Sequence, residues 1–365
     1  MASGYQVYVT FSGEKGGKIQ NVGALAADGS FLGDVLANGG PFDELRGLAI
    51  DERGRLYVAN AYKKASAVDV FSATINADGF TRDFLGTLIT PATTRALLHP
   101  YGVAFDGDNL FVSSQDTNVV SGYAISGKKM PKAKNLSVAS YLQKLHRKGD
   151  YYAGTFVASA DPVKVGKQTP PAVDPDKGGL SATGFVAKTA ATDDNPPEAA
   201  DDAKPIAQQA RHSVRGIAVG GKRLYVADQA KNRVGIYGHK SGTFHGWIDT
   251  TADTSAKPNA LDMPVGITVS PADGRVYIGS PKNEAIFAYD PKSKKLELIV
   301  SSTTSGVPKG ALHDLSGLSF APDGTLLFGS RTQQQLYTFG AASGAVTPFG
   351  DKLADTPECV LVVPV

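Results

Sequence analysis

A short phrase, one glycine followed by three small or apolar residues, recurs along the chain and constrains its fold more than any other feature. The copies are Arg46-Gly-Leu-Ala-Ile, Tyr101-Gly-Val-Ala-Phe, Arg215-Gly-Ile-Ala-Val, Val265-Gly-Ile-Thr-Val and Ser316-Gly-Leu-Ser-Phe. The last three glycines stand at positions 216, 266 and 317, so they are 50 and 51 residues apart. A fixed period of this length is typical of repeat architectures in which each repeat is one supersecondary unit.

Each phrase is followed by a turn and then by a second apolar run. These runs are Leu56-Tyr-Val-Ala-Asn60, Leu110-Phe-Val-Ser-Ser114, Leu224-Tyr-Val-Ala-Asp228, Val276-Tyr-Ile-Gly-Ser280 and Leu326-Leu-Phe-Gly-Ser330. They are short, bounded by polar or turn-forming residues and rich in Val, Ile, Tyr and Phe, which favours strands over helices. The sequence therefore predicts an all-β protein with very little helix.

The two ends of the chain predict a closed ring. The N-terminal unit has second, third and fourth strands but no first one, and Pro357-Glu-Cys-Val-Leu-Val-Val-Pro364 near the C-terminus reads like the missing strand. Five complete units and this split one make a six-bladed β-propeller, a fold in which radial repetition protects the sheet edges. A seventh blade within residues 127–211 is the alternative.

The repeats resemble those of the NHL family. In the fourth unit, Gly-Ile-Ala-Val, Leu-Tyr-Val-Ala-Asp and then Asn232-Arg233-Val234 lie close to the family's consensus. The resemblance covers nearly the whole chain outside one insertion. It implies a propeller but not one chemistry, since the family includes protein-binding platforms, carbohydrate or RNA binders and metal-dependent lyases.

Composition limits the partners. The 365 residues include 37 basic and 35 acidic side chains, a formal charge of +2, which favours neither nucleic acid nor an anionic membrane. The single cysteine, Cys359, excludes a disulfide or thiolate metal cluster within a monomer. We expect one domain spanning residues 1–365, a monomer, with no membrane span; the compartment stays open between cytoplasmic and secreted after removal of a leader.

Residues 127–211 form an insertion where a standard repeat would need far fewer residues. Its first part contains Lys128-Lys-Met-Pro-Lys-Ala-Lys134 and a segment that could form a short helix, and Thr155 to Ala158 could supply a fourth strand. Beyond Pro162 it is rich in Pro, Ala, Asp and Lys. The insertion is expected either to cover the tunnel mouth as a lid or to be a solvated excursion.

Alignment of the repeats predicts the candidate site. The residues before the repeated glycines converge on the tunnel mouth, and they include Arg46, Tyr101, Arg215 and Ser316, with Glu358 at the equivalent place in the C-terminal strand. In a functional interpretation the two arginines bind a substrate carboxylate or phosphate while Glu358 or Tyr101 transfers a proton. In a structural one, Arg46, Arg215 and Glu358 form a buried network that plugs the tunnel.

A second ring is expected where the second strands end. Its members with binding potential are Asn60, Gln115, Asp228 and Arg331. Asp228 is also the ordinary residue of the repeat, for which a turn or capping role is the alternative.

Three histidines precede first strands at related places. His99 is three residues before its glycine, and His212 and His313 are four before theirs. Resemblance to propeller lyases implies a divalent metal site, zinc or calcium, on these residues, with His212 also a candidate for proton transfer. In those lyases the histidine directly precedes the glycine, and here it does not.

These features predict a small-molecule enzyme, a lyase, hydrolase or cyclase, acting on an anionic or polar substrate at the tunnel mouth. The alternative is a non-catalytic propeller that binds a protein, glycan or other ligand on the same face. A concave pocket would favour the enzyme, and a flatter, aromatic-rich surface would favour the platform.

Overall fold

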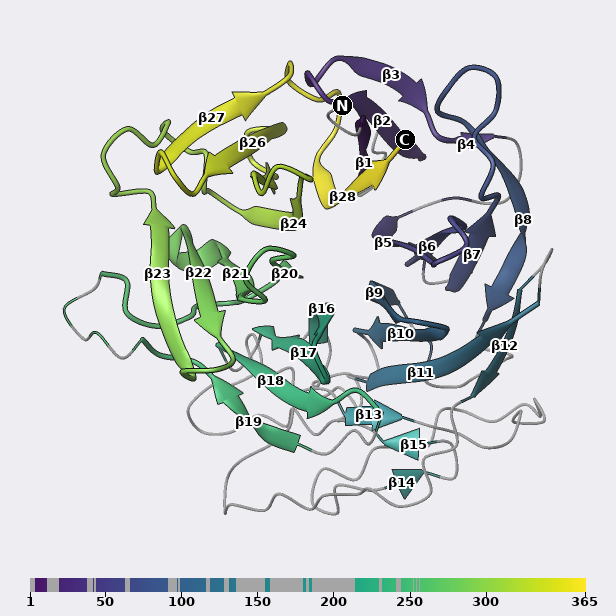
Figure 1. Cartoon of the computed structure of the whole chain (residues 1–365), viewed down its shortest axis with the longest axis horizontal. Helices are drawn as coiled ribbons and strands as arrows, with labels where there is room; N and C mark the ends of the chain where they lie inside the picture. The colour runs from purple at the N-terminus through teal and green to yellow at the C-terminus, as the bar shows by residue number, and fades with distance from the viewer. Residues whose placement is uncertain are drawn as a thin grey trace, which may run out of the picture.

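The computed structural model shows a ring of antiparallel sheets around a central axis (Figure 1). It describes residues 4–11, 20–37, 42, 44–62, 66–90, 97, 99–115, 119–127, 131–135, 155–157, 180–181, 184–185, 214–229, 232–240, 244–251, 253, 255 and 257–365.

The first three blades come from the N-terminal half of the chain and from its last strand. From the axis outward, blade 1 contains β28 (Pro357–Pro364), β1 (Tyr5–Phe11), β2 (Val22–Ala26) and β3 (Phe31–Asp34). Blade 2 contains β5 (Leu45–Ile50), β6 (Leu56–Asn60), β7 (Ala67–Phe71) and β8 (Arg82–Ile89), with the short β4 (Leu36–Ala37) parallel to β8. Blade 3 contains β9 (Pro100–Asp106), β10 (Asn109–Ser114), β11 (Val119–Ser126) and β12 (Lys132–Asn135).

The other three blades repeat the same order. Blade 4 contains β16 (Val214–Gly220), β17 (Arg223–Asp228), β18 (Arg233–Gly238) and β19 (Phe244–Ile248). Blade 5 contains β20 (Ile267–Val269), β21 (Val276–Ser280), β22 (Ala285–Asp290) and β23 (Lys295–Ser301). Blade 6 contains β24 (Leu315–Phe320), β25 (Leu326–Ser330), β26 (Gln335–Gly340) and β27 (Ala345–Phe349).

The C-terminal strand closes the ring as the sequence predicts. β28 pairs antiparallel with β1, with Val7 opposite Val362 and Val9 opposite Val360. The six-bladed all-β propeller expected from the NHL-like repeats is therefore confirmed, and the described strands build six blades rather than seven. The helix that lies wholly within the described residues is a 3-10 turn, Pro281–Asn283, and none of the described residues lies in a helix able to cross a membrane.

The fourth strand of blade 3 differs from expectation. It is β12, formed by part of the Lys128 to Lys134 cluster and paired with the far end of β11. The predicted strand at Thr155 is instead β13 (Thr155–Val157), which lies parallel to the start of β11. β14 (Leu180–Ser181) and β15 (Gly184–Phe185) pair with each other. Apart from these strands and residue 131, residues 128–213 lie outside the described residues, so the lid stays a prediction.

Packing between neighbouring blades supplies the core. One cluster joins Tyr225 and Val234 of blade 4 to Ile278 and Phe287 of blade 5, and equivalent clusters join the other blades. All four of these side chains are at most 1% exposed. Burying such apolar surfaces between sheets is what holds the ring together.

The glycine of the repeated phrase is explained by the crowding of the innermost strands. A Cβ atom on Gly216 would lie 2.3 Å from the carbonyl oxygen of Val265, and one on Gly266 would lie 2.2 Å from that of Ser316. Gly216 N–H also donates to the Val265 carbonyl across the blade boundary, at 3.0 Å. Only glycine allows backbones to approach this closely, so the phrase marks where blades meet at the axis.

Candidate functional site

A repeated irregularity at the start of the first strands aims the residues before the glycines toward the axis. Pairing with the second strand shifts register between Leu45 and Leu48 in blade 2, and the same shift recurs in blades 4 and 6. Arg46 and Arg215 fall in these bulges, where a residue leaves the regular ladder and its side chain is redirected.

The residues two positions before Arg46 and its equivalents adopt left-handed backbone conformations. Glu44, His99, Met263 and Asp314 have φ angles of 50° to 54° and begin blades 2, 3, 5 and 6 in the same way. Asp, Asn and His tolerate this region better than most residues, although non-glycine residues are uncommon there. The conformation places all four side chains in the wall of the tunnel mouth.

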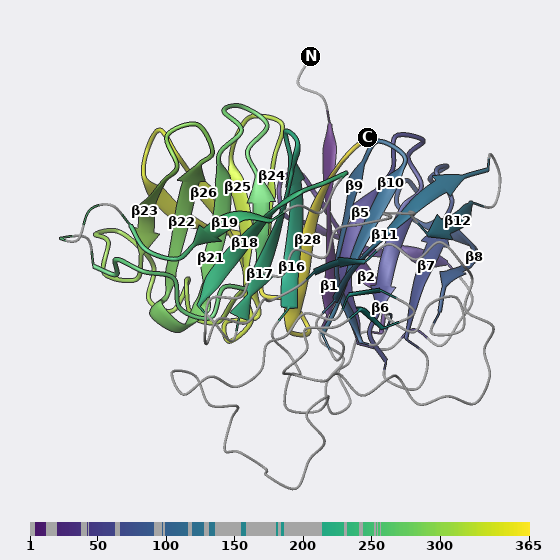
Figure 2. The same cartoon turned by 90° about the horizontal axis from the view of Figure 1, so that it is seen from below.

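A cavity of about 710 Å³ opens at this mouth. Its lining is mostly polar or charged: Glu44, Arg46, His99, Tyr101, Gln115, Arg215, Gln229, Lys282, Glu284, His313, Asp314, Arg331, Thr332 and Glu358, with Met263, Val265, Pro281 and Leu315. Because β28 begins at this face and ends at the other, the C-terminus lies on the opposite side of the ring (Figure 2).

A second chamber of about 340 Å³ continues the tunnel between the first strands. The two chambers share Arg46, Tyr101, Val265 and Glu358. These four residues, with Arg215 against Tyr101 and Arg331 against Glu358, form the floor of the mouth cavity. Beyond this floor the lining becomes largely apolar, with residues such as Ile217 and Leu361. The charged groups of the tunnel therefore lie in the mouth cavity and its floor, and not in the inner chamber beyond it.

Glu358 is paired with two arginines in this floor. Its Oε1 atom lies 2.6 Å from Nη1 of Arg46 and 2.9 Å from Nη2 of Arg331. Glu358 is 2% exposed and Arg46 6%, so the pair is buried. Arg331 also has its Nε atom 3.7 Å from Oδ2 of Asp314. The structure thus brings Arg46 and Glu358 together as the sequence predicts and adds Arg331 to them.

Arg215 is held differently. Its Nε atom donates to Oε1 of Gln229 at 2.8 Å, and its guanidinium carbon lies 5.3 Å from the centre of the Tyr101 ring. Burial, together with the positive charge of Arg46, lowers the pKa of Arg215 to about 10, so it is still a cation at neutral pH. Burial and the negative charge of Glu358 raise the pKa of Tyr101 well above its usual range, which keeps its hydroxyl protonated.

Two buried hydroxyls fix the backbone of these arginines. Thr10 accepts from the Cys359 N–H at 3.0 Å and donates to the Arg46 carbonyl at 2.7 Å. Ser113 likewise accepts from the Gly102 N–H at 2.7 Å and donates to the Arg215 carbonyl at 2.6 Å. The four other blades have Ala59, Ala227, Gly279 and Gly329 at this position, so a hydroxyl occurs only where the next blade carries an arginine.

Replacing Ser113 by alanine is expected to disturb Arg215 specifically. The change leaves a buried N–H and a buried carbonyl without their shared partner, which should cost about 1–2 kcal/mol of folding free energy. The side-chain Nε–H signal of Arg215 should shift in the ¹⁵N NMR spectrum. Ser330→Ala removes an equally buried hydroxyl, bonded to the Gly310 and His313 carbonyls, and serves as the control. An Arg215 signal that is unchanged in Ser113→Ala would refute the positioning role.

Two of the three predicted histidines, His99 and His313, line the cavity, and each lies beside a glutamate. Nε2 of His99 lies 3.6 Å from Oε2 of Glu44, and Nδ1 of His313 lies 2.5 Å from Oε1 of Glu284. His212 lies outside the described residues. Within the described part of the chain, no group of three His, Cys, Asp or Glu side chains could hold a metal, so a zinc or calcium site involving His212 stays a prediction.

Most residues of the second predicted ring, where the second strands end, do not reach the mouth cavity. Asn60 hydrogen-bonds to Asp69 at 3.4 Å, Asp228 pairs with Arg233 at 3.1 Å, and neither lines the mouth cavity. Ser316 faces the inner chamber. Gln115 and Arg331 reach the mouth, as does Gln229 at the same repeat position, because these residues follow the second strands rather than end them. The structure thus places Asn60, Asp228 and Ser316 outside the mouth cavity, and a binding role for them stays a prediction.

Three further acidic residues of the site were not singled out by sequence reasoning. Glu44 and Asp314 share a repeat position with His99, one place before the first strand, and this alignment could have found them. Glu284 follows the 3-10 turn of blade 5, which the repeat does not predict.

Comparison with known proteins supports the fold. No protein-family model and no curated protein sequence matches the chain. Among solved structures, a periplasmic gluconolactonase of Pseudomonas aeruginosa is 16% identical with a TM-score of 0.56, and all of each chain is covered. A candidate 6-phosphogluconolactonase of Bacteroides uniformis is 15% identical with a TM-score of 0.55, covering 99% of this chain and 100% of that one.

A chain of the nidogen/laminin complex is similar to the same extent. It is 10% identical with a TM-score of 0.53, covering 99% of this chain and 98% of that chain. Similarity at these identities establishes the propeller. A gluconolactonase and a chain of the nidogen/laminin complex share this fold, so function has to be argued from the site.

Proposed function

We propose that this protein is a small-molecule enzyme, a hydrolase or lyase, that acts on an anionic or polar substrate in the mouth cavity. The observation that carries the proposal is the charge of the cavity floor. Arg46, Arg215 and Arg331 converge there, while the described carboxylates paired with them are Glu358 and Asp314. One guanidinium is left over, which favours a ligand that brings a negative charge.

The shape of the site also supports an enzyme over a binding platform. The mouth is a concave cavity within the size range of small-molecule sites, and Tyr101 is the one Phe, Tyr or Trp among its described lining residues. A platform for a macromolecule would present a flatter and more aromatic surface.

Tyr101 is the best-placed proton donor. It lies in the floor beside Arg215, and its raised pKa keeps the hydroxyl protonated at neutral pH. A phenol in this position could protonate a leaving oxygen or stabilise a developing oxyanion. Glu358 is engaged by two guanidiniums, which supports the structural interpretation of that residue.

Turnover can be measured with compounds that match the charge of the site and the activity named for one similar structure. That neighbour is a gluconolactonase, so lactones of sugar acids, with and without a phosphate, are the first substrates to test, followed by aryl esters of carboxylic acids. Tyr101→Phe keeps the ring beside Arg215 and is expected to lower kcat/KM about 100-fold. Tyr277→Phe, in the packing between blades 5 and 6, is the control.

Two results would contradict this proposal. Full activity of Tyr101→Phe would remove its proton donor. Binding of anions without turnover of any compound in the panel would favour the non-catalytic ligand-binding propeller.

A further inference from the structure

Arg215 differs from the other two floor arginines in its charge balance. Glu358 lies against Arg46 and Arg331, and Asp314 lies near Arg331. Among the described residues no carboxylate pairs with Arg215, whose side-chain partners are an amide and an aromatic ring. Its positive charge is thus the one that the described floor leaves uncompensated.

The side chain is nevertheless fixed in place. Gln229 accepts from Nε, the Tyr101 ring lies beneath the guanidinium, and Ser113 holds the backbone carbonyl. Arg215 also lines the mouth cavity. Its Nη1 atom is buried and has no hydrogen-bond partner among the described residues.

Gln115 provides a second donor of the same kind. The residue is 3% exposed, lines the same cavity and has an Nε2 atom with no partner in the described part of the chain. Buried donors without acceptors cost free energy, and proteins rarely keep them unless a ligand or water completes them. Two such donors lining one cavity indicate that a ligand would place a hydrogen-bond acceptor between blades 3 and 4.

We propose that Arg215 and Gln115 form a subsite for the carboxylate group of a small organic acid. Both groups are planar donors, and a carboxylate has two acceptor oxygens in one plane to match them. One uncompensated charge suits a monoanion better than a phosphate dianion. The inference rests on the proposed function only in taking the mouth cavity as the ligand site, and it specifies how the substrate would be anchored.

Calorimetric titration of the purified chain at neutral pH tests the subsite. The probes are gluconate and pyruvate, with inorganic phosphate and glucose as comparisons. We expect the two carboxylates to bind, phosphate to bind at least about tenfold more weakly, and glucose not to bind detectably. Arg215→Met should weaken carboxylate binding about tenfold or more and Gln115→Leu about threefold to tenfold. Arg275→Met, which removes an arginine paired with the exposed Glu297, is the matched control.

A spectroscopic measurement on the unmodified protein guards against variants that fail to fold. Gluconate should shift the Nε–H signal of Arg215 in the ¹⁵N spectrum, and affinity should be constant from pH 7 to 9 and decline above about pH 10, where Arg215 loses its proton. The proposal is overturned if no carboxylate binds, if phosphate binds more tightly, or if Arg215→Met binds as well as the parent. Carboxylate binding without turnover would retain this subsite while rejecting the enzymatic proposal, so the two failures are distinguishable.

Discussion

Replacing Arg82 by methionine is expected to lower the free energy of unfolding by about 4 kcal/mol, because a buried guanidinium with several acceptors would be lost. Arg82 is 3% exposed and lies where blades 1 and 2 meet. Its Nε donates to the Tyr8 hydroxyl at 3.2 Å, and Nη1 donates to the carbonyls of Gly54, Ser72 and Ala73 at 2.8, 2.7 and 3.2 Å. Methionine fills part of the volume but leaves these carbonyls unsatisfied.

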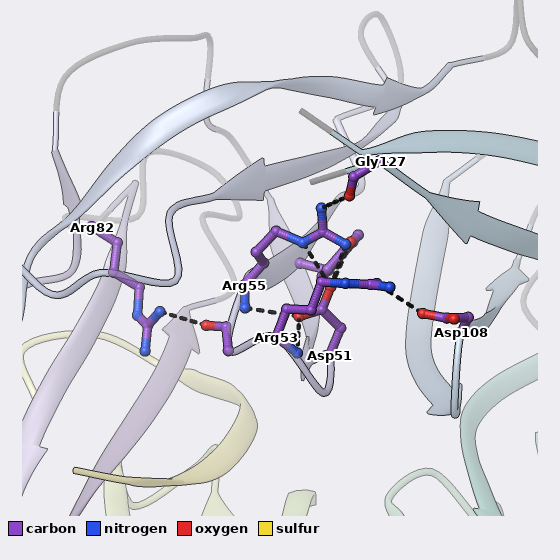
Figure 3. Close-up of polar contacts among 8 residues, drawn as sticks. Asp51, Arg53, Arg55, Arg82, Asp108 and Gly127 are labelled. Carbon is purple, nitrogen blue, oxygen red and sulfur yellow. Dashed lines mark hydrogen bonds and ion pairs between the residues drawn. The ribbon is translucent and has the colours of Figure 1, made fainter. Parts of the chain in front are cut away.

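The neighbouring Arg53 provides a control of the opposite kind (Figure 3). It donates to Asp108 at 2.8 Å, but both side chains are largely exposed, at 43% and 58%. Arg53→Met should therefore have little effect on stability. Urea denaturation of both variants gives the comparison. Equal losses would show that Arg82 does not fasten blade 1 to blade 2, and a loss in Arg82→Met below about 1 kcal/mol would show the same.

Arg82 also marks a limit of sequence reasoning. The repeats predict the strands, the blade order and the closing role of the C-terminal strand, because each depends on a local pattern that recurs six times. Arg82 occurs in one blade only and acts mainly through backbone carbonyls of two separate segments, at Gly54 and at Ser72 and Ala73. A contact that does not recur in the repeats and is made mostly to backbone carbonyls leaves no signal in a single sequence.

The site shows the same division. Arg46, Tyr101, Arg215 and Glu358 could be found because the repeat aligns them at one level of the tunnel. Asn60 and Asp228 lie outside the mouth cavity because their side chains bond to Asp69 and Arg233 on the third strands of their own blades, so a binding role for them stays a prediction. Arg215 keeps an uncompensated charge because Glu358 pairs with Arg46 and Arg331 of other blades. The spacing of the repeats in the sequence does not predict these contacts between side chains.

Replacing Glu358 by leucine should also destabilise the protein by about 4 kcal/mol, because breaking a buried ion pair leaves a buried charge uncompensated. Here the loss removes the carboxylate that Arg46 and Arg331 share, since both lie within 3 Å of the same carboxylate oxygen. Asp314 still lies near Arg331, so the larger part of the cost falls on Arg46.

That attribution can be tested with a double-mutant cycle. Arg46→Leu alone should be costly for the same reason, whereas Glu358→Leu combined with Arg46→Leu should recover at least about 2 kcal/mol relative to the sum of the single changes. Losses that simply add would mean that the two side chains do not depend on each other. A strong coupling would instead establish Glu358 as the internal counterion of Arg46. The carboxylate would then hold Arg46 within the floor, and Arg215 would be the arginine left to meet an anion from solution.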